Sequence, residues 1–460
     1  MKSKLLLTAA FAAVLATSAQ AQVTLNVTGA TAFRTATINS IVNAYGGTAA
    51  VRIVHSNSNN TNYTGANAIS FRGNWPALGD TIIRCRFSGS TEGIRDLVGT
   101  VVPGTPNDVF YYPDTDIPAL AGPANFVNKN ENANPVTANV AFKPDVAFSD
   151  VQQTSSPFRT PVLQPADSRV GVVLFVFCKS QGSSANLTNV TAQAWRAALT
   201  NNRGVPLNVF TGLSADQSGR VLATGRNDGS GTRAVYLIEP GYGVSKLVNQ
   251  FKIGANGFNG VTSAGFTGDV INFLQLWPSN DAEDANNNSV LWNALTTGNG
   301  GYFSGGSVST LLQKDTSSVR VLGPTGTDLT SSGSYVGTSL GNPRAVSVVG
   351  FVGTNDGVNV IAGGGDVLAF EGVKITPVAT GVDPTGLVPA DRYKVTNGSY
   401  TVWSYERLFN RGTLDANQNT VVYGAGGIVA SIPGGLANSG IALTDMIAVR
   451  QNDGDVVTQP

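Results

Sequence analysis

The apolar run Val170-Gly-Val-Val-Leu-Phe-Val-Phe177 contains no polar side chain. A strand that is hydrophobic at successive positions is buried on both faces, as in the centre of an α/β sheet. Helical spacing follows over residues 187–199, with Ala194, Trp195 and Ala198 clustered on one face. The pattern predicts a central strand followed by a helix.

Strands and helices alternate before this run. Residues 23–27 and 82–87 have the composition of strands, and 146–148 is a short apolar run. The apolar residues of 33–45 fall on one helical face, and residues 94–98 begin a short helix. This alternation favours parallel strands with helices on both faces, and therefore an α/β fold.

Length and composition allow two lobes of ordinary size. The chain has 460 residues, of which 42% are hydrophobic and only 13% charged, and it contains 54 glycines. Residues 254–342 are rich in Gly, Ser, Thr and Asn, which predicts a loop-and-strand insertion in a second lobe. Strand-like runs resume at 345–352, 367–375 and 400–408.

The first 21 residues have the organisation of a secretory signal. Lys2 and Lys4 precede an apolar stretch over residues 5–16, and Ala19-Gln20-Ala21 forms a small-residue cleavage site. The apolar stretch is shorter than the roughly 18 residues that span a bilayer, so a retained anchor is disfavoured. We expect cleavage after Ala21 and a periplasmic or secreted protein.

Several function classes are disfavoured by composition. The chain has 29 basic and 29 acidic residues, and loss of the signal leaves a net charge near −2, without the basic stripe typical of nucleic-acid binding. The single histidine, His55, and two cysteines cannot supply the usual zinc ligands, and a lone histidine argues against a Ser-His-Asp hydrolase. We therefore expect no enzyme activity, no metal and no cofactor. Export permits a Cys85–Cys178 disulfide, but buried free thiols in strands are an equal alternative.

The most informative motif is Arg226-Asn-Asp-Gly-Ser-Gly-Thr232, which lies between a strand-like run and a helical stretch. Its glycines permit a tight turn that brings backbone N–H groups close to a ligand. Ser230 and Thr232 place hydroxyls at a helix start, where the dipole favours an anion, and Arg226 offers two donors to an oxyanion. The alternative interpretation is a capped helix after a glycine turn.

Three further segments have a related construction. Thr28-Gly-Ala-Thr-Ala-Phe33 and Gly89-Ser-Thr-Glu-Gly-Ile-Arg95 each end a strand and open a helix, and Ser149-Asp150 follows another short strand. Each alone could be a plain helix cap, but anion sites are built where such termini converge at strand ends. A carboxylate such as Asp150 accepts a hydrogen bond from HPO₄²⁻ and repels fully ionised sulfate, so it would select between them.

In this order, the four segments resemble those of the phosphate-binding periplasmic proteins that serve ABC transporters. That family has a G-A-T-F-like turn, a G-S-x-G-G-[IV]-K turn, a G-A-S-D segment and an R-x-D-G-S-G-T segment. The corresponding residues are 29–33, 89–95, 147–150 and 226–232. The apolar run at 170–177 resembles the family's crossover strand between lobes, and further likeness reaches both ends of the mature chain but not residues 254–342.

The resemblance implies a two-lobed type-2 periplasmic-binding-protein fold with mixed sheets flanked by helices. Lobe 1 would comprise residues 22–165 and 366–460, and lobe 2 residues 166–365 with the insertion. The implied function is capture of an oxyanion, most readily phosphate, by a monomer that delivers it to an ABC transporter permease. The implied ligand contacts are Thr31, Phe33, Ser90, Asp150, Arg226, Ser230, Gly231 and Thr232, with Phe33 contributing mainly its backbone N–H.

The sequence departs from the family pattern at three positions. Ala32 is an extra residue between Thr31 and Phe33, Arg34 stands where the family often has Pro, and Glu92 replaces a Gly. Arg34 could compensate the charge of Glu92, or Glu92 could point to solvent. These changes and the insertion leave an alternative function open, an exported surface or matrix protein that keeps the fold without serving phosphate transport.

Two segments have the alternating oxygen side chains of a calcium loop. They begin at Asp284 and Asp415, and both lack the glycine and the terminal glutamate of the full motif. Turns rich in Asn and Asp are the alternative interpretation, and we favour it.

Overall fold

The computed structural model describes residues 22–59, 62–76, 78–100, 105–122, 125–131, 139–254, 273–277, 298–323, 345–379, 385–436 and 440–459. The predicted signal peptide and the loop at Asp284 lie outside the described residues. So does most of the 254–342 insertion.

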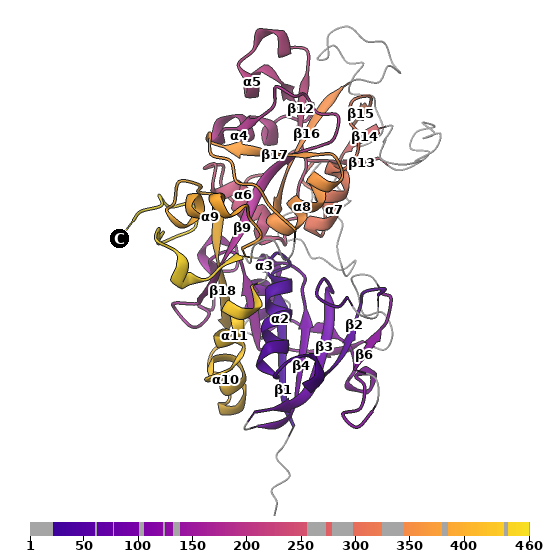
Figure 1. Cartoon of the computed structure of the whole chain (residues 1–460), viewed down its shortest axis with the longest axis vertical. Helices are drawn as coiled ribbons and strands as arrows, with labels where there is room; N and C mark the ends of the chain where they lie inside the picture. The colour runs from indigo at the N-terminus through magenta and orange to yellow at the C-terminus, as the bar shows by residue number, and fades with distance from the viewer. Residues whose placement is uncertain are drawn as a thin grey trace, which may run out of the picture.

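A mixed sheet runs through both halves of the molecule and is shared at one strand, β9 (Arg169–Lys179) (Figure 1). The first half of β9 pairs with the strands of lobe 1, and its second half pairs with those of lobe 2. The two-lobed α/β fold predicted from the sequence is confirmed, with the apolar run at its centre.

Lobe 1 has strand order β6-β2-β3-β4-β1-β8-β18-β9, with β19 on the other edge of β9. Helices α2, α10 and α11 pack together, and α3 packs on β1 and β8. The strands are β1 (Val23–Gly29), β2 (Val51–His55), β3 (Ala68–Trp75), β4 (Gly79–Arg86), β6 (Phe126–Asn128), β8 (Val146–Ser149), β18 (Trp403–Asn410) and β19 (Gly440–Ile441), with β5 (Val109–Tyr111) and β7 (Val140–Phe142) as a separate pair. The helices are α2 (Arg34–Ala44), α3 (Ser90–Val98), α10 (Ala416–Tyr423) and α11 (Ile428–Gly435).

Lobe 2 continues from β9 through β16, β12 and β11 on one side and through β17 and β10 on the other. Its strands are β10 (Asn189–Val190), β11 (Val205–Pro206), β12 (Arg220–Ala223), β16 (Val346–Gly353) and β17 (Asp366–Phe370), with β13 (Phe251–Ile253), β14 (Phe273–Leu276) and β15 (Arg320–Leu322) in a small separate sheet. The helices are α4 (Ala192–Thr200), α5 (Asn208–Thr211), α6 (Gly231–Ile238), α7 (Gly305–Leu312) and α8 (Thr354–Ala362).

The chain crosses between the lobes twice, through β9 and again between β17 and β18, a stretch that contains α9 (Pro389–Thr396). The boundary of 365 expected from the sequence falls just before β17, yet β17 pairs with β10 and with the second half of β9. We therefore propose that lobe 2 extends through β17 and that the return to lobe 1 follows it.

The strands are not all parallel, although the alternation of strands and helices in the sequence favoured a parallel sheet. β1 is parallel to β4 and β8, but β3 runs antiparallel to β2 and β4. β9 is antiparallel to every strand that pairs with it. Short connections such as that between β3 and β4 join antiparallel neighbours without a crossover helix.

The core around β9 explains how lobe 2 holds its helices. Phe177 stacks against Phe370 and meets Phe351 and Trp195 edge-on. The Trp195 indole donates to the Tyr236 carbonyl oxygen at 3.1 Å, which ties α4 to α6. The predicted helix is shorter than its periodic stretch: Thr191 caps α4 by accepting from the Ala194 N–H (3.1 Å), and the residues before it form β10.

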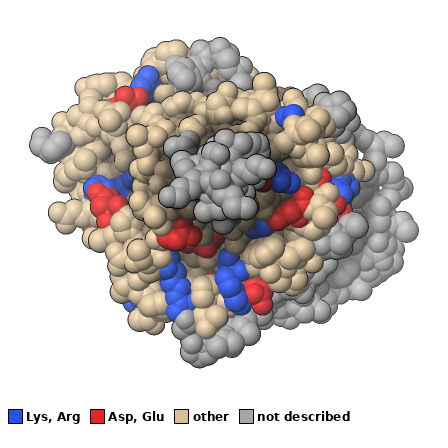
Figure 2. Space-filling view, turned by 90° about the horizontal axis from the view of Figure 1, so that it is seen from below, with Lys and Arg blue, Asp and Glu red and all other residues tan. Residues whose placement is uncertain are grey.

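Lys and Arg patches lie beside Asp and Glu patches on the end of lobe 1 shown in Figure 2. Within the described ranges, no helix is long and apolar enough to cross a membrane. Cys85 and Cys178 are buried free thiols. Asp415 accepts from the backbone N–H groups of Asn417 and Gln418 as the N-cap of α10, so its side chain serves a helix start.

Candidate functional site

The four predicted segments meet at the waist between the lobes. Lobe 1 contributes Thr31 before α2, Ser90 at the start of α3 and Asp150 after β8. Lobe 2 contributes Arg226 and the start of α6. The helix starts of α3 and α6 are in contact, because the Glu92 N–H donates to the Gly229 carbonyl oxygen at 3.1 Å.

The loop before α6 is turned so that its first residues face lobe 1. Ser230 is the N-cap, and its hydroxyl accepts from the Arg233 N–H at 3.3 Å. Gly231 approaches the other lobe so closely that a Cβ atom there would lie 1.5 Å from Asp150 Oδ1 and 2.6 Å from the Ser90 Cβ. Only glycine permits this approach, so the second glycine of the motif has a steric role at the lobe interface.

Arg226 is the centre of the hydrogen bonds between the lobes. Its Nη2 donates to Thr31 Oγ1 at 3.0 Å, and its Nη1 lies 3.5 Å from Thr232 Oγ1. The guanidinium is also held from behind, since Nε donates to the Tyr302 carbonyl oxygen (3.2 Å) and Nη2 to that of Phe303. The two carbonyl contacts thus orient the Arg226 guanidinium toward the hydroxyls of Thr31 and Thr232.

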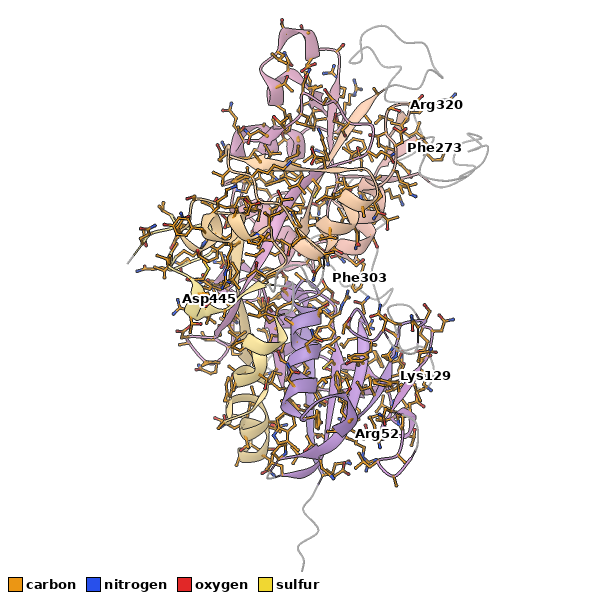
Figure 3. All side chains as sticks on the ribbon, viewed as in Figure 1. Arg52, Lys129, Phe273, Phe303, Arg320 and Asp445 are labelled. Atoms are coloured by element: carbon orange, nitrogen blue, oxygen red, sulfur yellow. The ribbon has the colours of Figure 1, made fainter. Side chains whose placement is uncertain are left out.

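Tyr302 and Phe303 were not identified from the sequence. Phe303 lies at the waist of the molecule (Figure 3), and Tyr302 forms a bridge with Arg226. Both act through backbone carbonyls, and a backbone contact leaves no residue-type signal. Ser304, which caps α7 by accepting from the Ser307 N–H at 3.1 Å, was the only local signal of a helix start beside them.

Phe33 stands at the start of α2, and its side chain makes a core contact. It is the N-cap residue of α2 and is fully buried. Its ring lies 6.2 Å from that of Phe148, centroid to centroid, and packs close to Gly171 of β9. The ring anchors the start of α2 to the sheet and so holds Thr31 at the interface.

Asp150 is a buried carboxylate with an unusual environment. It is 1% exposed, and neither carboxylate oxygen has a hydrogen-bond partner among the described residues. Burial raises the pKa of Asp150 to about 6, while the nearby Ser90 hydroxyl and Arg226 charge partly offset that increase. The backbone is fixed by β18, where the Ser404 hydroxyl donates to the Asp150 carbonyl oxygen at 2.5 Å.

A second buried carboxylate, Glu406, lies on β18 and was not predicted. Its oxygens also have no partner within the described part of the chain. Burial, and then the charge of Asp150, raise the pKa of Glu406 well above its usual value. Burial likewise lowers the pKa of Arg226 to about 10, which leaves it charged at pH 7. The site therefore combines a charged guanidinium with two buried carboxyl groups whose pKa values are raised.

Replacing Asp150 by asparagine should stabilise the ligand-free protein at neutral pH. Because the folded pKa of about 6 exceeds the ordinary 3.8, the folded state binds more protons between these values, and wild-type stability falls as pH rises through that window. The pKa shift corresponds to a free energy of unfolding that is higher in the variant than in the wild type by roughly 3 kcal/mol at pH 7.5, and equal below about pH 4. Urea unfolding at several pH values measures it, with exposed Asp108→Asn as control. A stability difference that does not change with pH would refute the assignment.

Neither expectation for Glu92 and Arg34 is confirmed. The Glu92 side chain is only 4% exposed and forms an ion pair with Arg95 on its own helix at 2.9 Å. It also contacts Gly229 of the opposite lobe, where a Cβ would lie 2.9 Å from Glu92 Oε2. Glu92 therefore neither points to solvent nor relies on Arg34 for compensation, because α3 carries its own arginine three residues on.

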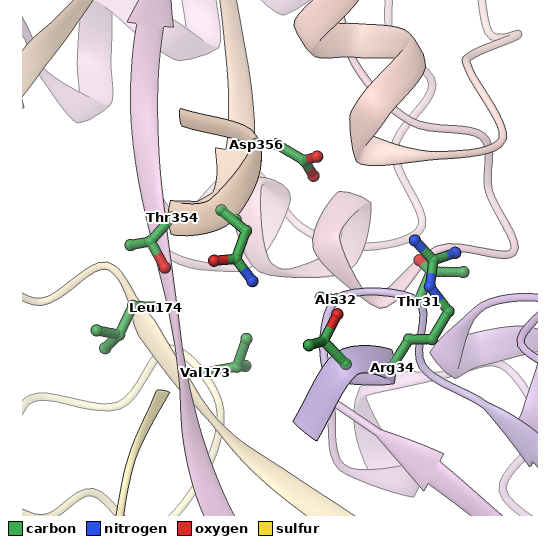
Figure 4. Close-up of a pocket in the computed structure, with 10 residues that line it drawn as sticks. Thr31, Ala32, Arg34, Val173, Leu174, Thr354 and Asp356 are labelled. Carbon is green, nitrogen blue, oxygen red and sulfur yellow. The ribbon is translucent and has the colours of Figure 1, made fainter. Parts of the chain in front are cut away.

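Arg34 instead lines a cavity of about 60 Å³ between the lobes (Figure 4). Thr31, Ala32 and Arg34 form one wall, Asp356 and neighbouring α8 residues the other, and Val173 and Leu174 of β9 lie behind. The Nε and Nη1 atoms of Arg34 are buried and have no hydrogen-bond partner among the described residues. Burial lowers the pKa of Arg34 to about 10, against the opposing effect of Asp356.

Among the described residues, no group of three or more His, Cys, Asp and Glu side chains could hold a metal ion. Thr31 connects the cavity beside Arg34 to Arg226. It lines that cavity, and its hydroxyl accepts a hydrogen bond from the Arg226 guanidinium. The arrangement offers cationic and hydroxyl groups to an anion, with a carboxylate at its edge.

Comparisons with known proteins gave no family model and no curated protein that matches the chain. Among solved structures, the chain is similar to a protein assigned as a phosphate ABC transporter substrate-binding protein, with bound phosphate, from Clostridium perfringens (11% identity, TM-score 0.39, 91% of this chain and 99% of that one). It is also similar to PstS from Borrelia burgdorferi (9%, 0.31, 87% and 93%). A third is described as a possible phosphate binding protein from Planctomyces limnophilus (8%, 0.32, 84% and 81%). At these identities and TM-scores, we argue function from this chain's own residues.

Proposed function

We propose that this chain is a divergent member of the phosphate-binding protein family that its motifs resemble, and that it captures phosphate between its lobes after export. The observation that supports this most strongly is the convergence of Thr31, Ser90 and Asp150 from lobe 1 with Arg226 and the start of α6 from lobe 2. These segments are far apart in sequence, and ordinary helix capping does not require them to meet.

Anion binding would use groups already oriented toward one another. The Arg226 contacts to the Tyr302 and Phe303 carbonyls would persist, because they hold the guanidinium from the lobe 2 side. Its contacts to the Thr31 and Thr232 hydroxyls are the ones that an anion would share. The N-termini of α3 and α6 would add backbone donors and a favourable dipole.

Phosphate is favoured over sulfate by Asp150. The buried Asp150 carboxylate can accept a hydrogen bond from HPO₄²⁻, whereas fully ionised sulfate brings only repulsion. With a pKa of about 6, Asp150 is ionised at neutral pH and can accept that proton. In this role the chain binds and releases its ligand, and we propose an ABC transporter permease as the partner of a periplasmic or secreted monomer that is not an enzyme.

Calorimetric titration at pH 7.5 tests the proposal. Phosphate should bind saturably to the ligand-stripped protein, and sulfate at least about 100-fold more weakly, because like-charge contacts cost several kcal/mol and each 1.4 kcal/mol is about tenfold in affinity. Asp150→Asn should reduce the difference to less than about tenfold, since it removes the repelling charge. If neither anion produces heat of binding, the phosphate function is wrong.

One observation favours the alternative of a surface or matrix protein. Glu92 places a buried carboxylate against Gly229 at the contact between the lobes, and the Glu92 N–H is occupied by the Gly229 carbonyl oxygen. A donor of α3 that an anion could use is therefore already satisfied by protein. Absence of anion binding in the titration, together with a folded protein, would favour this alternative.

A further inference from the structure

A second, larger cavity continues from the one beside Arg34. It has a volume of about 490 Å³, within the usual size range of small-molecule sites. Thr35 and Asn355 line both cavities, so the two are adjacent along the cleft. Thr31 in turn joins the smaller cavity to Arg226. The smaller cavity therefore lies between the proposed anion site, which it borders at Thr31, and the larger cavity.

The larger cavity is lined mainly by uncharged polar side chains from both lobes. On α2, Thr35 and Asn39 are four residues apart and share a face, and on α8 the same is true of Asn355 and Asn359. The two helices thus present matching polar faces to the cavity. Val358 adds an apolar contact, and none of the described side chains that line the cavity is charged.

Several of these groups are available to a ligand. Asn359 makes no side-chain hydrogen bond within the described residues, and Asn39 uses only its Nδ2, which donates to the Gly435 carbonyl oxygen at 3.3 Å. An amide offers two donors and an acceptor, which suits hydroxyl groups because these also both donate and accept. Such a lining without charge disfavours a second ionic group and favours a hydroxylated one.

The smaller cavity places opposite charges side by side. Arg34 has two buried donors without partners, while Asp356 extends from α8 on the other side (Figure 4). A bare oxyanion at this point would gain from Arg34 and be repelled by Asp356. A ligand hydroxyl here would satisfy both, because it can donate to Asp356 and accept from Arg34.

We propose that the cleft binds phosphate as the monoester of a sugar, with the phosphate at Arg226 and the hydroxylated ring in the cavity lined by Asn39, Asn355 and Asn359. This inference rests on the proposed function, because it takes the phosphate end of the ligand to lie at the Arg226 site. Arg34 would donate to the ester oxygen that links the two parts, and Asp356 would accept from a neighbouring hydroxyl of the sugar.

The test compares inorganic phosphate, glucose 6-phosphate and glucose by calorimetric titration of the full exported chain. Glucose 6-phosphate should bind at least about tenfold more tightly than inorganic phosphate, the gain expected of one or two added hydrogen bonds. Asn359→Leu should remove that gain and leave the affinity for inorganic phosphate unchanged. Asn419→Leu, on the exposed surface of α10, is the matched control and should change neither affinity.

The possible outcomes separate this inference from the proposed function. If inorganic phosphate binds as tightly as glucose 6-phosphate, or if Asn359→Leu weakens both equally, the sugar monoester assignment is overturned and the phosphate function stands. If glucose binds as tightly as glucose 6-phosphate while inorganic phosphate does not bind, the phosphate function fails and the assignment fails with it. A preference for glucose 6-phosphate that Asn359→Leu abolishes supports both.

Discussion

Replacing Arg226 by alanine is expected to weaken phosphate binding by at least about 100-fold, because each hydrogen bond to a charged group contributes roughly 1.5–3 kcal/mol and two donors face the site. The expectation follows from the orientation of the guanidinium, which two carbonyls hold toward the Thr31 and Thr232 hydroxyls. Titration calorimetry measures the loss. Arg226→Lys should recover only part of the affinity, since a point charge cannot replace the fork.

A matched substitution separates binding from folding. Arg84 is also a buried arginine, but it pairs with Asp114 and Asn26 in lobe 1, away from the lobe contact. Arg84→Ala should lower the free energy of unfolding without changing phosphate affinity. If Arg226→Ala binds phosphate as the wild type does, or if Arg84→Ala loses binding equally while folded, Arg226 is not the anion-binding group.

Gly231→Ala is expected to prevent closure of the lobes and to reduce phosphate affinity by roughly 10- to 100-fold, since overpacking typically costs about 1–3 kcal/mol. The added Cβ would lie 1.5 Å from Asp150 Oδ1, so the two lobes could not keep their present approach. Small-angle scattering should show that phosphate no longer reduces the radius of gyration of the variant. Circular dichroism would verify that each lobe remains folded.

Gly306 provides the control for this substitution. It also lies in the first turn of a helix, α7, but the nearest atom to a Cβ there is Ser304 Oγ at 3.6 Å, an ordinary contact. Gly306→Ala should therefore preserve both affinity and compaction. Normal closure of the Gly231→Ala protein on phosphate would contradict the close approach of α6 to Asp150.

Much of the candidate site was predictable because its residues lie in local motifs. Arg226, Ser230, Gly231 and Thr232 belong to one continuous stretch whose glycines, hydroxyls and charge indicate an anion-binding turn, and the structure places that stretch at the lobe contact. Their role toward a ligand stays a prediction until binding is measured. The Asp415 segment shows the opposite case, because a side chain of the same type only caps α10.

Other members of the site could not be predicted, because only tertiary contacts between distant parts of the chain bring them there. Tyr302 and Phe303 act through backbone carbonyls that any residue would offer. Asp356 lies in the first turn of α8, after Gly353 and Thr354. This helix start combines glycine and a hydroxyl as the other segments do, but nothing in the sequence indicates that it faces Arg34. Glu406 is an ordinary strand residue in sequence, and only its complete burial makes it unusual.

The sequence by itself determined the central strand, the strand-to-helix turns and the residue types available to an anion, because hydrophobic periodicity and glycine turns act over short stretches. The tertiary structure decided which groups face one another: Glu92 against Gly229, and Asp150 against Gly231. It also set Thr35 and Asn39 of α2 and the amides of α8 around one cavity. These contacts join positions distant in the chain, and their geometry depends on how β9 sets the lobes together, which no local pattern encodes.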